Sequence, residues 1–199
     1  MYRDLIKKSY DQIAEYYLTH RTELKSNKHV SQLLKLLPKQ SQVLDLGCGA
    51  GVPIDDLILK AGHSVIGIDI SPKQIELARK YCPRGQFITG DIAELRIAEY
   101  QVDAIISFYA LFHLPRTQHA EILKTWSRNL SSGGLMLVSM GDREFEGNHS
   151  TLGIQLWSSQ YGTKKNSQMV MNAGFDIIAE DIDTSGGERH QVILARKIS

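Results

Sequence analysis

The apolar residues of the first 38 positions are spaced as on the faces of helices. In residues 2–17, and again in residues 30–37, they recur every three or four positions, which is the period of an amphipathic α-helix. Pro38 follows the second run directly and would end that helix. The pattern therefore predicts an N-terminal helical cap over residues 1–38.

From residue 42 onward, short apolar runs alternate with stretches of helical spacing. This alternation predicts an α/β fold in which a seven-stranded, mostly parallel sheet carries helices on both faces. The strands are expected at residues 42–46, 64–70, 86–89, 103–108, 135–140, 175–183 and 190–197, and the helices at residues 53–60, 71–81, 115–130 and 164–173.

The end of the chain departs from the alternation in two ways. The last two predicted strands are joined by Thr-Ser-Gly-Gly, which indicates a hairpin and makes the last strand antiparallel. Residues 141–162 are mainly polar and are expected to form a long connection without regular structure.

Length and charge narrow the class of protein. A chain of 199 residues, 42% of them hydrophobic, can build one domain with a sizeable core. Its 23 basic and 22 acidic residues argue against a dedicated nucleic-acid binder. No apolar run reaches the roughly 18 residues that cross a bilayer, and two cysteines without metal-site spacing favour a reducing cytoplasm. The expectation is a cytoplasmic protein without a metal site or membrane contact, either a monomer or a homodimer.

A glycine-rich loop follows the first predicted strand, in residues 43–51, VLDLGCGAG. A nucleoside triphosphate loop would end in Gly-Lys-Ser/Thr, and no lysine is present here. A dinucleotide loop would have the pattern Gly-x-Gly-x-x-Gly: Gly47 and Gly49 fit, but Val52 stands where the third glycine belongs. Asp69 follows the loop at the sequence spacing, about 20 residues, that is expected of an acidic residue that binds a ribose. These features favour a ligand that has a ribose but no phosphate.

Three spaced motifs resemble those of the class I S-adenosylmethionine-dependent methyltransferases, in their small-molecule branch. They are the loop of residues 43–51, the acidic Asp69 after the second strand, and Gly90–Asp91–Ile92 after the third. Residues 10–17 and 130–134 are also similar to this family, so the resemblance covers essentially the whole chain. It implies a Rossmann-like sandwich, S-adenosylmethionine as cofactor and S-adenosylhomocysteine as product. One domain is then expected over residues 1–199, with a cofactor-binding half in 41–140 and a substrate-side lid with the terminal strands in 141–199.

The resemblance also suggests roles around the cofactor. Gly47 and Gly49 let the backbone pass close to the ligand, and Asp69 accepts hydrogen bonds from the ribose hydroxyls. Asp45 either reaches the amino-acid tail or orders the loop. Any of the aspartates could instead be a turn or capping residue.

The remaining cofactor contacts are expected from four other parts of the chain. Ile70 packs on the adenine, Asp91 accepts from the adenine amine beside the Ile92 amide, and Phe108 adds a contact after the fourth strand. Tyr10 and Tyr17 either close over the cofactor, where aromatic faces favour a sulfonium cation, or pack in the core. These residues are Tyr10, Tyr17, Ile70, Asp91, Ile92 and Phe108.

The acceptor is expected beside the fourth strand end. Tyr109 and Phe112 would line an apolar pocket there, and His113 is the candidate general base, unless it merely packs at the next helix. The chain has no Asn/Asp-Pro-Pro-Tyr/Phe after this strand, which argues against methylation of nucleobases or glutamine. From the 141–162 connection, Trp157 and Tyr161 would form a lid or anchor the loop, and His149 either joins the pocket or lies on the surface.

Three functions remain open from the sequence. The main hypothesis is methyl transfer from S-adenosylmethionine to a small-molecule acceptor, with no nucleic-acid or membrane partner. The alternatives are a regulatory or accessory protein that binds the cofactor without turnover, and an NAD-dependent oxidoreductase. The last requires a pyrophosphate site, which Val52 disfavours.

Overall fold

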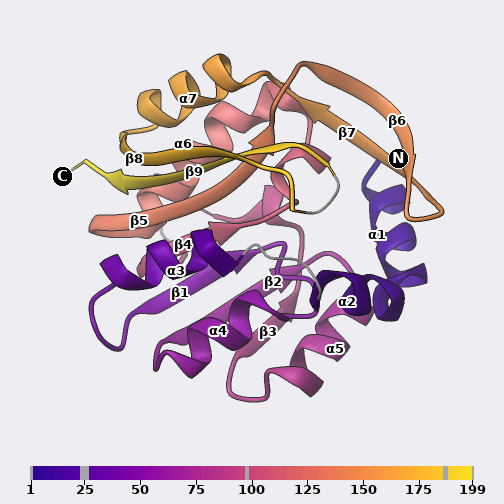
Figure 1. Ribbon diagram of the computed structural model, residues 1–199, viewed down its shortest axis with the longest axis horizontal. Helices are drawn as coiled ribbons and strands as arrows, with labels where there is room; N and C mark the ends of the chain where they lie inside the picture. The colour runs from indigo at the N-terminus through magenta and orange to yellow at the C-terminus, as the bar shows by residue number, and fades with distance from the viewer. Residues whose placement is uncertain (1, 23–26, 97–98, 186–187, 199) are drawn as a thin grey trace.

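The computed structural model describes residues 2–22, 27–96, 99–185 and 188–198 (Figure 1). Its centre is a seven-stranded sheet with the strand order β3-β2-β1-β4-β5-β9-β8. The strands are β1 (Gln42–Leu46), β2 (Ser64–Asp69), β3 (Gln86–Thr89), β4 (Val102–Ser107), β5 (Leu130–Gly141), β8 (Phe175–Asp183) and β9 (His190–Lys197). Strands β1 to β5 pair in parallel, and β9 runs antiparallel between β5 and β8. The predicted Rossmann-like fold is confirmed, including the antiparallel last strand.

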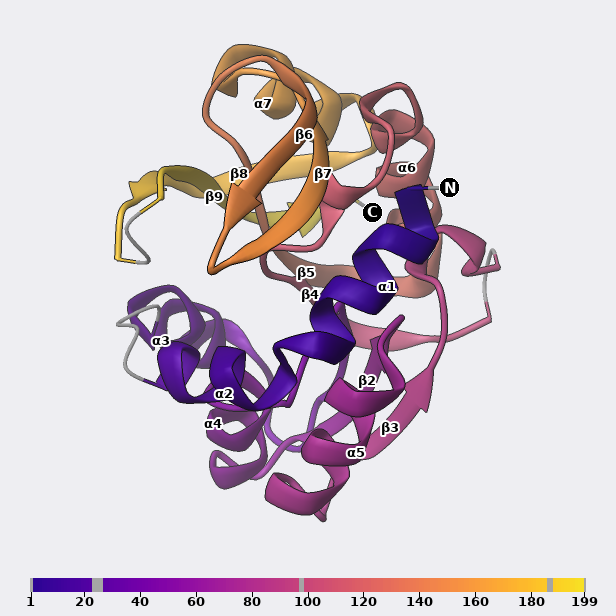
Figure 2. The ribbon, with the colours of Figure 1, turned by 90° about the vertical axis from the view of Figure 1, so that its right-hand side faces the viewer.

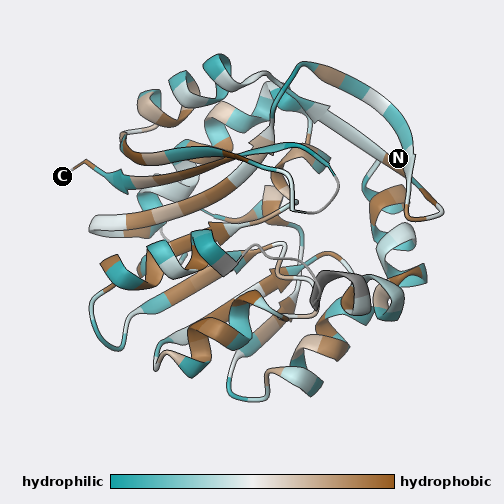
Figure 3. Ribbon diagram, viewed as in Figure 1, coloured by the Kyte–Doolittle hydropathy of each residue, from teal (hydrophilic) through white to brown (hydrophobic). Residues whose placement is uncertain are grey.

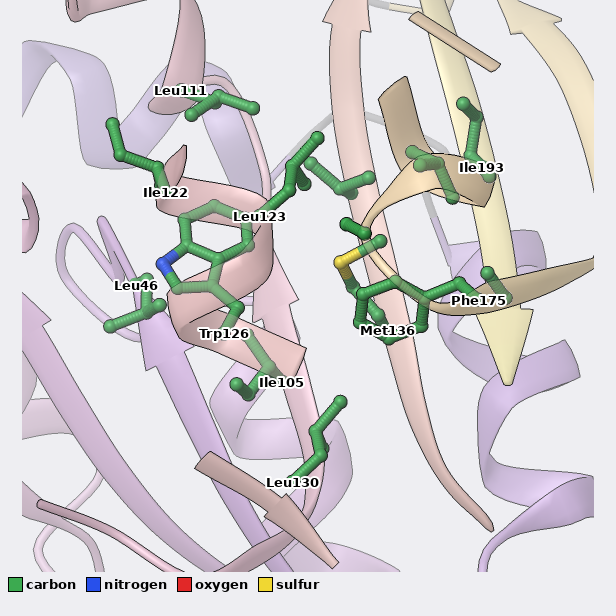
Figure 4. Close-up of a cluster of buried hydrophobic side chains, with 14 of the residues drawn as sticks. Leu46, Ile105, Leu111, Ile122, Leu123, Trp126, Leu130, Met136, Phe175 and Ile193 are labelled. Carbon is green, nitrogen blue, oxygen red and sulfur yellow. The ribbon is translucent and has the colours of Figure 1, made fainter. Parts of the chain in front are cut away.

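Helices cover both faces of the sheet. Their bounds are α1 (Tyr2–Gln12), α2 (Ala14–Thr22), α3 (Asn27–Leu36), α4 (Ile54–Lys60), α5 (Pro72–Tyr81), α6 (His119–Asn129) and α7 (Thr163–Asn172), with short 3-10 helices η1 (Ile92–Glu94), η2 (Leu111–His113) and η3 (Arg116–Gln118). One buried cluster packs α3, α4 and α5 on one face. The other packs α6 and α7 on the opposite face, around Trp126, which is fully buried (Figure 4). The hydropathy colours show the same layering, with apolar residues along the strands and the inner sides of the helices (Figure 3).

The prediction of an irregular connection over residues 141–162 is wrong, because most of this segment forms a β-hairpin. Strands β6 (Phe145–Thr151) and β7 (Ile154–Gln160) pair antiparallel in a separate two-stranded sheet. Leu152 and Gly153 have φ values of 50° and 76°, as the tight turns of hairpins require. β6 has few apolar residues and lies outside the main sheet, so the polar sequence hid the strand.

Helix α1 lies across the carboxyl ends of the parallel strands and not on either face of the sheet. In Figure 2 it crosses in front of the strands, between the hairpin and α5. Ile6 and Ile13 form a small buried cluster with Ile154 and Leu156 of β7. The N-terminal segment thus packs against a segment about 150 residues away in sequence, and together they cover the carboxyl ends of the parallel strands.

Candidate active site

A cavity lies where the first four parallel strands end, beneath α1. It encloses about 640 Å³, its opening to solvent included, which is within the range of small-molecule pockets. Many of the residues predicted as a site from sequence meet here, although they come from five separate segments. The lining residues are Tyr2, Arg3, Ile6, Tyr10, Tyr17, Gly47, Gly49, Asp69, Ile70, Gln74, Asp91, Ile92, Phe108, Tyr109, Ala110, His113 and Leu114.

The glycine loop turns tightly against the ends of β2 and β4. The Gly47 and Cys48 amides both donate to the Ile68 carbonyl, at 2.7 and 3.1 Å. Gly47 has a φ of +86°, and a Cβ at this position would lie 2.3 Å from the Cβ of Ala110. Glycine is therefore required at position 47 both by the backbone conformation and by the close approach of the segment after β4.

Asp69 joins the glycine loop to the start of α5. Its two carboxylate oxygens accept from the Gly49 amide at 2.9 Å and the Ser71 amide at 2.8 Å. Burial raises the pKa of Asp69 to about 6, against the opposing effect of these two hydrogen bonds. Each carboxylate oxygen has a second lone pair, so the group can still accept from two neighbouring hydroxyls on a ligand.

Asp91 lies at the other end of the cavity, after β3. One oxygen accepts from the Ala93 amide at 2.8 Å and caps η1. The other oxygen pairs with Nε of Arg3, from α1, at 2.9 Å. A ligand amine at this carboxylate would therefore share it with Arg3, a residue that the sequence analysis did not include in the site.

A smaller cavity adjoins the first at the glycine loop. It shares Tyr17, Gly47, Gly49 and Phe108 with the larger cavity, and it is also lined by Asp45. Asp45 is only 2% exposed and interacts with Asp55 of α4, which is fully buried. Burial, together with the charge of Asp45, raises the pKa of Asp55 well above its usual range. Both causes favour the protonated form of Asp55, and a protonated Asp55 can donate to Asp45 and so join the loop to α4.

Gln74 was not predicted from the sequence as a site residue, although its side chain lines the main cavity. It is 1% exposed, and neither its amide nitrogen nor its amide oxygen has a hydrogen-bond partner among the described residues. In a capping box this side chain would return to the Ser71 amide, but that amide donates to Asp69 instead. A buried amide without partners beside the cavity is placed to hydrogen-bond a ligand bound there. The Ser-x-x-Gln spacing was the available signal.

The glycine loop, the Asp69 carboxylate and the unpaired Gln74 amide together fit an extended nucleoside with a polar tail. Two connected cavities run along the strand ends from β3 towards β1 and β4, with Asp91 and Asp69 in the first and Asp45 in the second. A phosphate group would favour a basic residue in the loop, but residues 43–51 contain no lysine or arginine. The site therefore suits adenosine joined to an amino acid better than a dinucleotide.

His113 is held by hydrogen bonds on both ring nitrogens. Nε2 lies 2.9 Å from the Tyr10 hydroxyl, and Nδ1 lies 2.9 Å from the Trp157 carbonyl oxygen. The side chain is 6% exposed, and burial lowers its pKa to about 4. Tyr10 and Tyr17 line the same cavity with their rings edge to face at 5.4 Å.

The residues expected around the acceptor are divided between different places. Tyr109 lines the main cavity, whereas Phe112 and His149 line a third cavity under the hairpin. The side chains of Trp157 and Tyr161 line none of these cavities: the Trp157 ring packs on Tyr2 at 4.9 Å, and the Tyr161 ring lies under the Arg116 guanidinium at 5.2 Å. The rings of Trp157 and Tyr161 therefore pack against other side chains and do not face one of these cavities.

The described part of the chain offers neither a cluster of metal ligands nor a membrane-spanning helix. No group of three or more histidine, cysteine, aspartate or glutamate side chains is placed there to hold a metal ion. The helices described are all too short or too polar for a membrane span.

Comparison with known proteins adds independent information. Residues 43–134 match the family model described as a methyltransferase domain. An uncharacterized methyltransferase of Oceanobacillus iheyensis is 28% identical over 158 residues, which cover 78% of this chain and 67% of the relative. Trans-aconitate 2-methyltransferase of Escherichia coli O7:K1 is 30% identical over 153 residues, covering 75% and 60%. The chain spans about half the length of several other curated relatives it matches.

The fold is shared with solved structures of low sequence identity. The 1,6-didemethyltoxoflavin-N1-methyltransferase of Burkholderia thailandensis, solved with bound 1,6-didemethyltoxoflavin and S-adenosylhomocysteine, is 20% identical with a TM-score of 0.76. The alignment covers 99% of this chain and 87% of that protein. The likeness extends through the N-terminal helices and the terminal strands, so it establishes the architecture of nearly the whole chain.

Proposed function

We propose that the chain is a class I S-adenosylmethionine-dependent methyltransferase, as its match to the methyltransferase-domain model and its methyltransferase relatives suggest, and that it transfers the methyl group of S-adenosylmethionine to a small-molecule acceptor. The observation that supports this most is the convergence of the glycine loop, Asp69 and the unpaired Gln74 amide on one covered cavity. The cofactor supplies an activated methyl group on a sulfonium. The protein's task is to align that group with a nucleophile.

In this proposal the cavity residues divide the cofactor among them. Asp69 holds the ribose hydroxyls, Ile70 packs on the adenine, and Asp91, paired with Arg3, accepts from the adenine amine beside the Ile92 amide. The adjoining cavity at Asp45 takes the amino-acid tail. Residues 41–140 would then form the cofactor-binding half and residues 141–199 the acceptor side.

A small acceptor fits the rest of the site. Phe108, Tyr109 and Ala110 give the β4 end of the cavity an apolar wall, and the hairpin packs against α1, which covers the cavity (Figure 2). One curated relative is named for trans-aconitate and one solved neighbour for 1,6-didemethyltoxoflavin. Both names denote small molecules, which supports the class of acceptor without identifying it.

A thermal-shift experiment tests the cofactor and the class of reaction together. S-adenosylmethionine and S-adenosylhomocysteine are each expected to raise the Tm, because both carry the ribose and the tail that the site fits, whereas NAD is expected to leave it unchanged. Incubation with methyl-labelled cofactor and a library of small acceptors should then give labelled product. A Tm shift with NAD alone would favour the oxidoreductase, and binding without any labelled product would favour an accessory role.

His113 stays our candidate for accepting the acceptor's proton, and the geometry defines how this would occur. Nε2 faces the Tyr10 hydroxyl, so a proton would pass through Tyr10 Oη to the imidazole. We expect His113→Asn to lower kcat at saturating cofactor and to remove an ionisation from the acidic limb of the pH–rate profile. An unaltered profile in this variant would show that His113 takes no proton during the reaction.

A further inference from the structure

A chain of three groups joins the covering helix to the rest of the site. The Tyr10 hydroxyl of α1 lies 2.9 Å from Nε2 of His113 in η2, and Nδ1 of His113 lies 2.9 Å from the main-chain oxygen of Trp157 in β7. These contacts link segments that are more than 100 and more than 40 residues apart in sequence. The chemistry of the two ends determines where the hydrogens in this chain lie.

The Trp157 carbonyl oxygen can only accept a hydrogen bond, so Nδ1 of His113 must carry a hydrogen. Burial keeps the imidazole neutral near pH 7, because it lowers the pKa to about 4. A neutral imidazole with a hydrogen on Nδ1 has a bare Nε2. Nε2 must therefore accept, and the Tyr10 hydroxyl must donate. The hydrogen of Tyr10 is committed to His113, so the Tyr10 oxygen can meet any further group only as an acceptor.

The position of Tyr10 relates this oxygen to one part of the cofactor. The cavity with Asp69 and Asp91 and the cavity with Asp45 meet at Tyr17, Gly47, Gly49 and Phe108. A ligand with adenosine in the first and an amino-acid tail in the second must place the atom between them at this junction. In S-adenosylmethionine that atom is the sulfonium sulfur. Tyr10 lines the first cavity, and its ring contacts the ring of Tyr17 at the junction.

We propose that Tyr10, with its hydroxyl oriented by His113, recognises the positive charge of the sulfonium and makes the site prefer S-adenosylmethionine to S-adenosylhomocysteine. This inference rests on the proposed function. An oxygen that presents lone pairs attracts a cation, and the two tyrosine rings add to this attraction. The product is a neutral thioether, so it gains nothing from the same oxygen. His113 acts here as a positioning residue, whether or not it accepts a proton during methyl transfer.

The orientation of the Tyr10 hydroxyl also links the charge of the ligand to the closed position of α1. Tyr10 belongs to α1, which is held over the cavity through Ile6 and Ile13 and through contacts to β7 and α5. A ligand that attracts the Tyr10 oxygen stabilises this closed arrangement. The methylated cofactor would therefore hold α1 closed more strongly than the product does.

The test is calorimetry with S-adenosylmethionine and S-adenosylhomocysteine on the full chain and its Tyr10→Phe variant. The substitution keeps the ring and removes the oxygen. We expect affinity for S-adenosylmethionine to fall about fivefold to tenfold, with affinity for S-adenosylhomocysteine changed less than twofold. Tyr81→Phe, at an exposed ring on α5 away from the cavity, is the matched control and should change neither. An equal loss for both ligands, or no loss, would overturn the proposal.

Two substitutions of His113 test the orientation itself. His113→Asn keeps a donor for the Trp157 carbonyl but loses the acceptor of the Tyr10 hydrogen, so the preference for S-adenosylmethionine should fall as in Tyr10→Phe. His113→Gln places an amide oxygen near the Nε2 position and should retain most of the preference. An equal preference for S-adenosylmethionine in the two variants would contradict the orienting role of His113. This comparison can still be made if Tyr10→Phe fails to fold.

A measurement without any ligand separates this inference from the proposed function. Nitrogen-15 chemical shifts of the His113 ring should show a neutral imidazole with its hydrogen on Nδ1, and an Nε2-protonated ring would overturn the argument. If the parent protein shows that tautomer but binds neither nucleoside, the proposed function fails. If it binds both ligands with the ratio unaffected by Tyr10→Phe, the sulfonium contact fails and the proposed function stands.

Discussion

Gly47→Ala is expected to lower the free energy of unfolding by about 2–5 kcal/mol and to abolish measurable cofactor binding. The new Cβ would lie 2.3 Å from the Cβ of Ala110, so the loop or the segment after β4 must move, at a cost typical of overpacking. Alanine also pays about 1–2 kcal/mol for a φ of +86°. Urea unfolding gives the stability, and calorimetry with S-adenosylmethionine gives the binding.

Gly62 supplies the matched control for this substitution. It has a nearly identical φ of +89° after the end of α4, and a Cβ there would meet nothing within 4 Å. Gly62→Ala therefore pays the conformational cost alone, about 1–2 kcal/mol, and should bind the cofactor as the parent protein does. If both variants lose the same stability, the close approach of the loop to Ala110 is not what requires glycine at position 47.

Asp69→Ala is expected to weaken binding of S-adenosylmethionine by more than tenfold. In the proposed site the variant removes the acceptor of the ribose hydroxyls, which would then be buried unpaired. It also frees the Gly49 and Ser71 amides that Asp69 now holds. Asp103→Ala is the control, because Asp103 likewise accepts from a backbone amide, that of Gln42 at 2.8 Å, but does not line the cavity. Unchanged calorimetric affinity in Asp69→Ala would exclude the ribose contact.

The pH dependence of binding provides a second measure of Asp69. Its pKa is raised from 3.8 to about 6 because burial disfavours the carboxylate. Between these values the folded state binds more protons than the unfolded chain, so this group's contribution to stability falls as pH rises and is constant above about 6. In the proposed site the ligand binds the carboxylate, so affinity for S-adenosylmethionine is expected to rise with pH through about 6 and then level off. Asp69→Ala should lack this step.

The parts of the site that lie within local motifs were predictable from the sequence. Gly47 and Gly49 belong to one strand–loop pattern, and Asp69 follows the next strand at a spacing that the parallel sheet dictates. The structure brings these residues together with Asp91 because the carboxyl ends of β1, β2 and β3 share one edge of the sheet. Alternation of strands and helices was sufficient to predict that edge.

The parts that depend on contacts between distant segments were not predictable. Arg3 reaches Asp91 across nearly 90 residues, and Trp157 reaches His113 through its backbone oxygen, which no side-chain pattern records. The hairpin of β6 and β7 was missed because its turn has leucine where asparagine or aspartate usually signals such a turn. Gln74 was missed because only the capture of the Ser71 amide by Asp69 leaves its side chain unused.

The position of α1 has a kinetic consequence. Ser9 bonds to the Gln155 carbonyl at 2.8 Å, Tyr10 to His113, and Asp11 to Ser71, so three successive residues fasten this helix over the ligand. We expect a nucleoside bound beneath it to exchange only when these bonds break and the helix lifts. Opening of α1 would then set a ceiling on the number of catalytic cycles per second, however fast the methyl group moves.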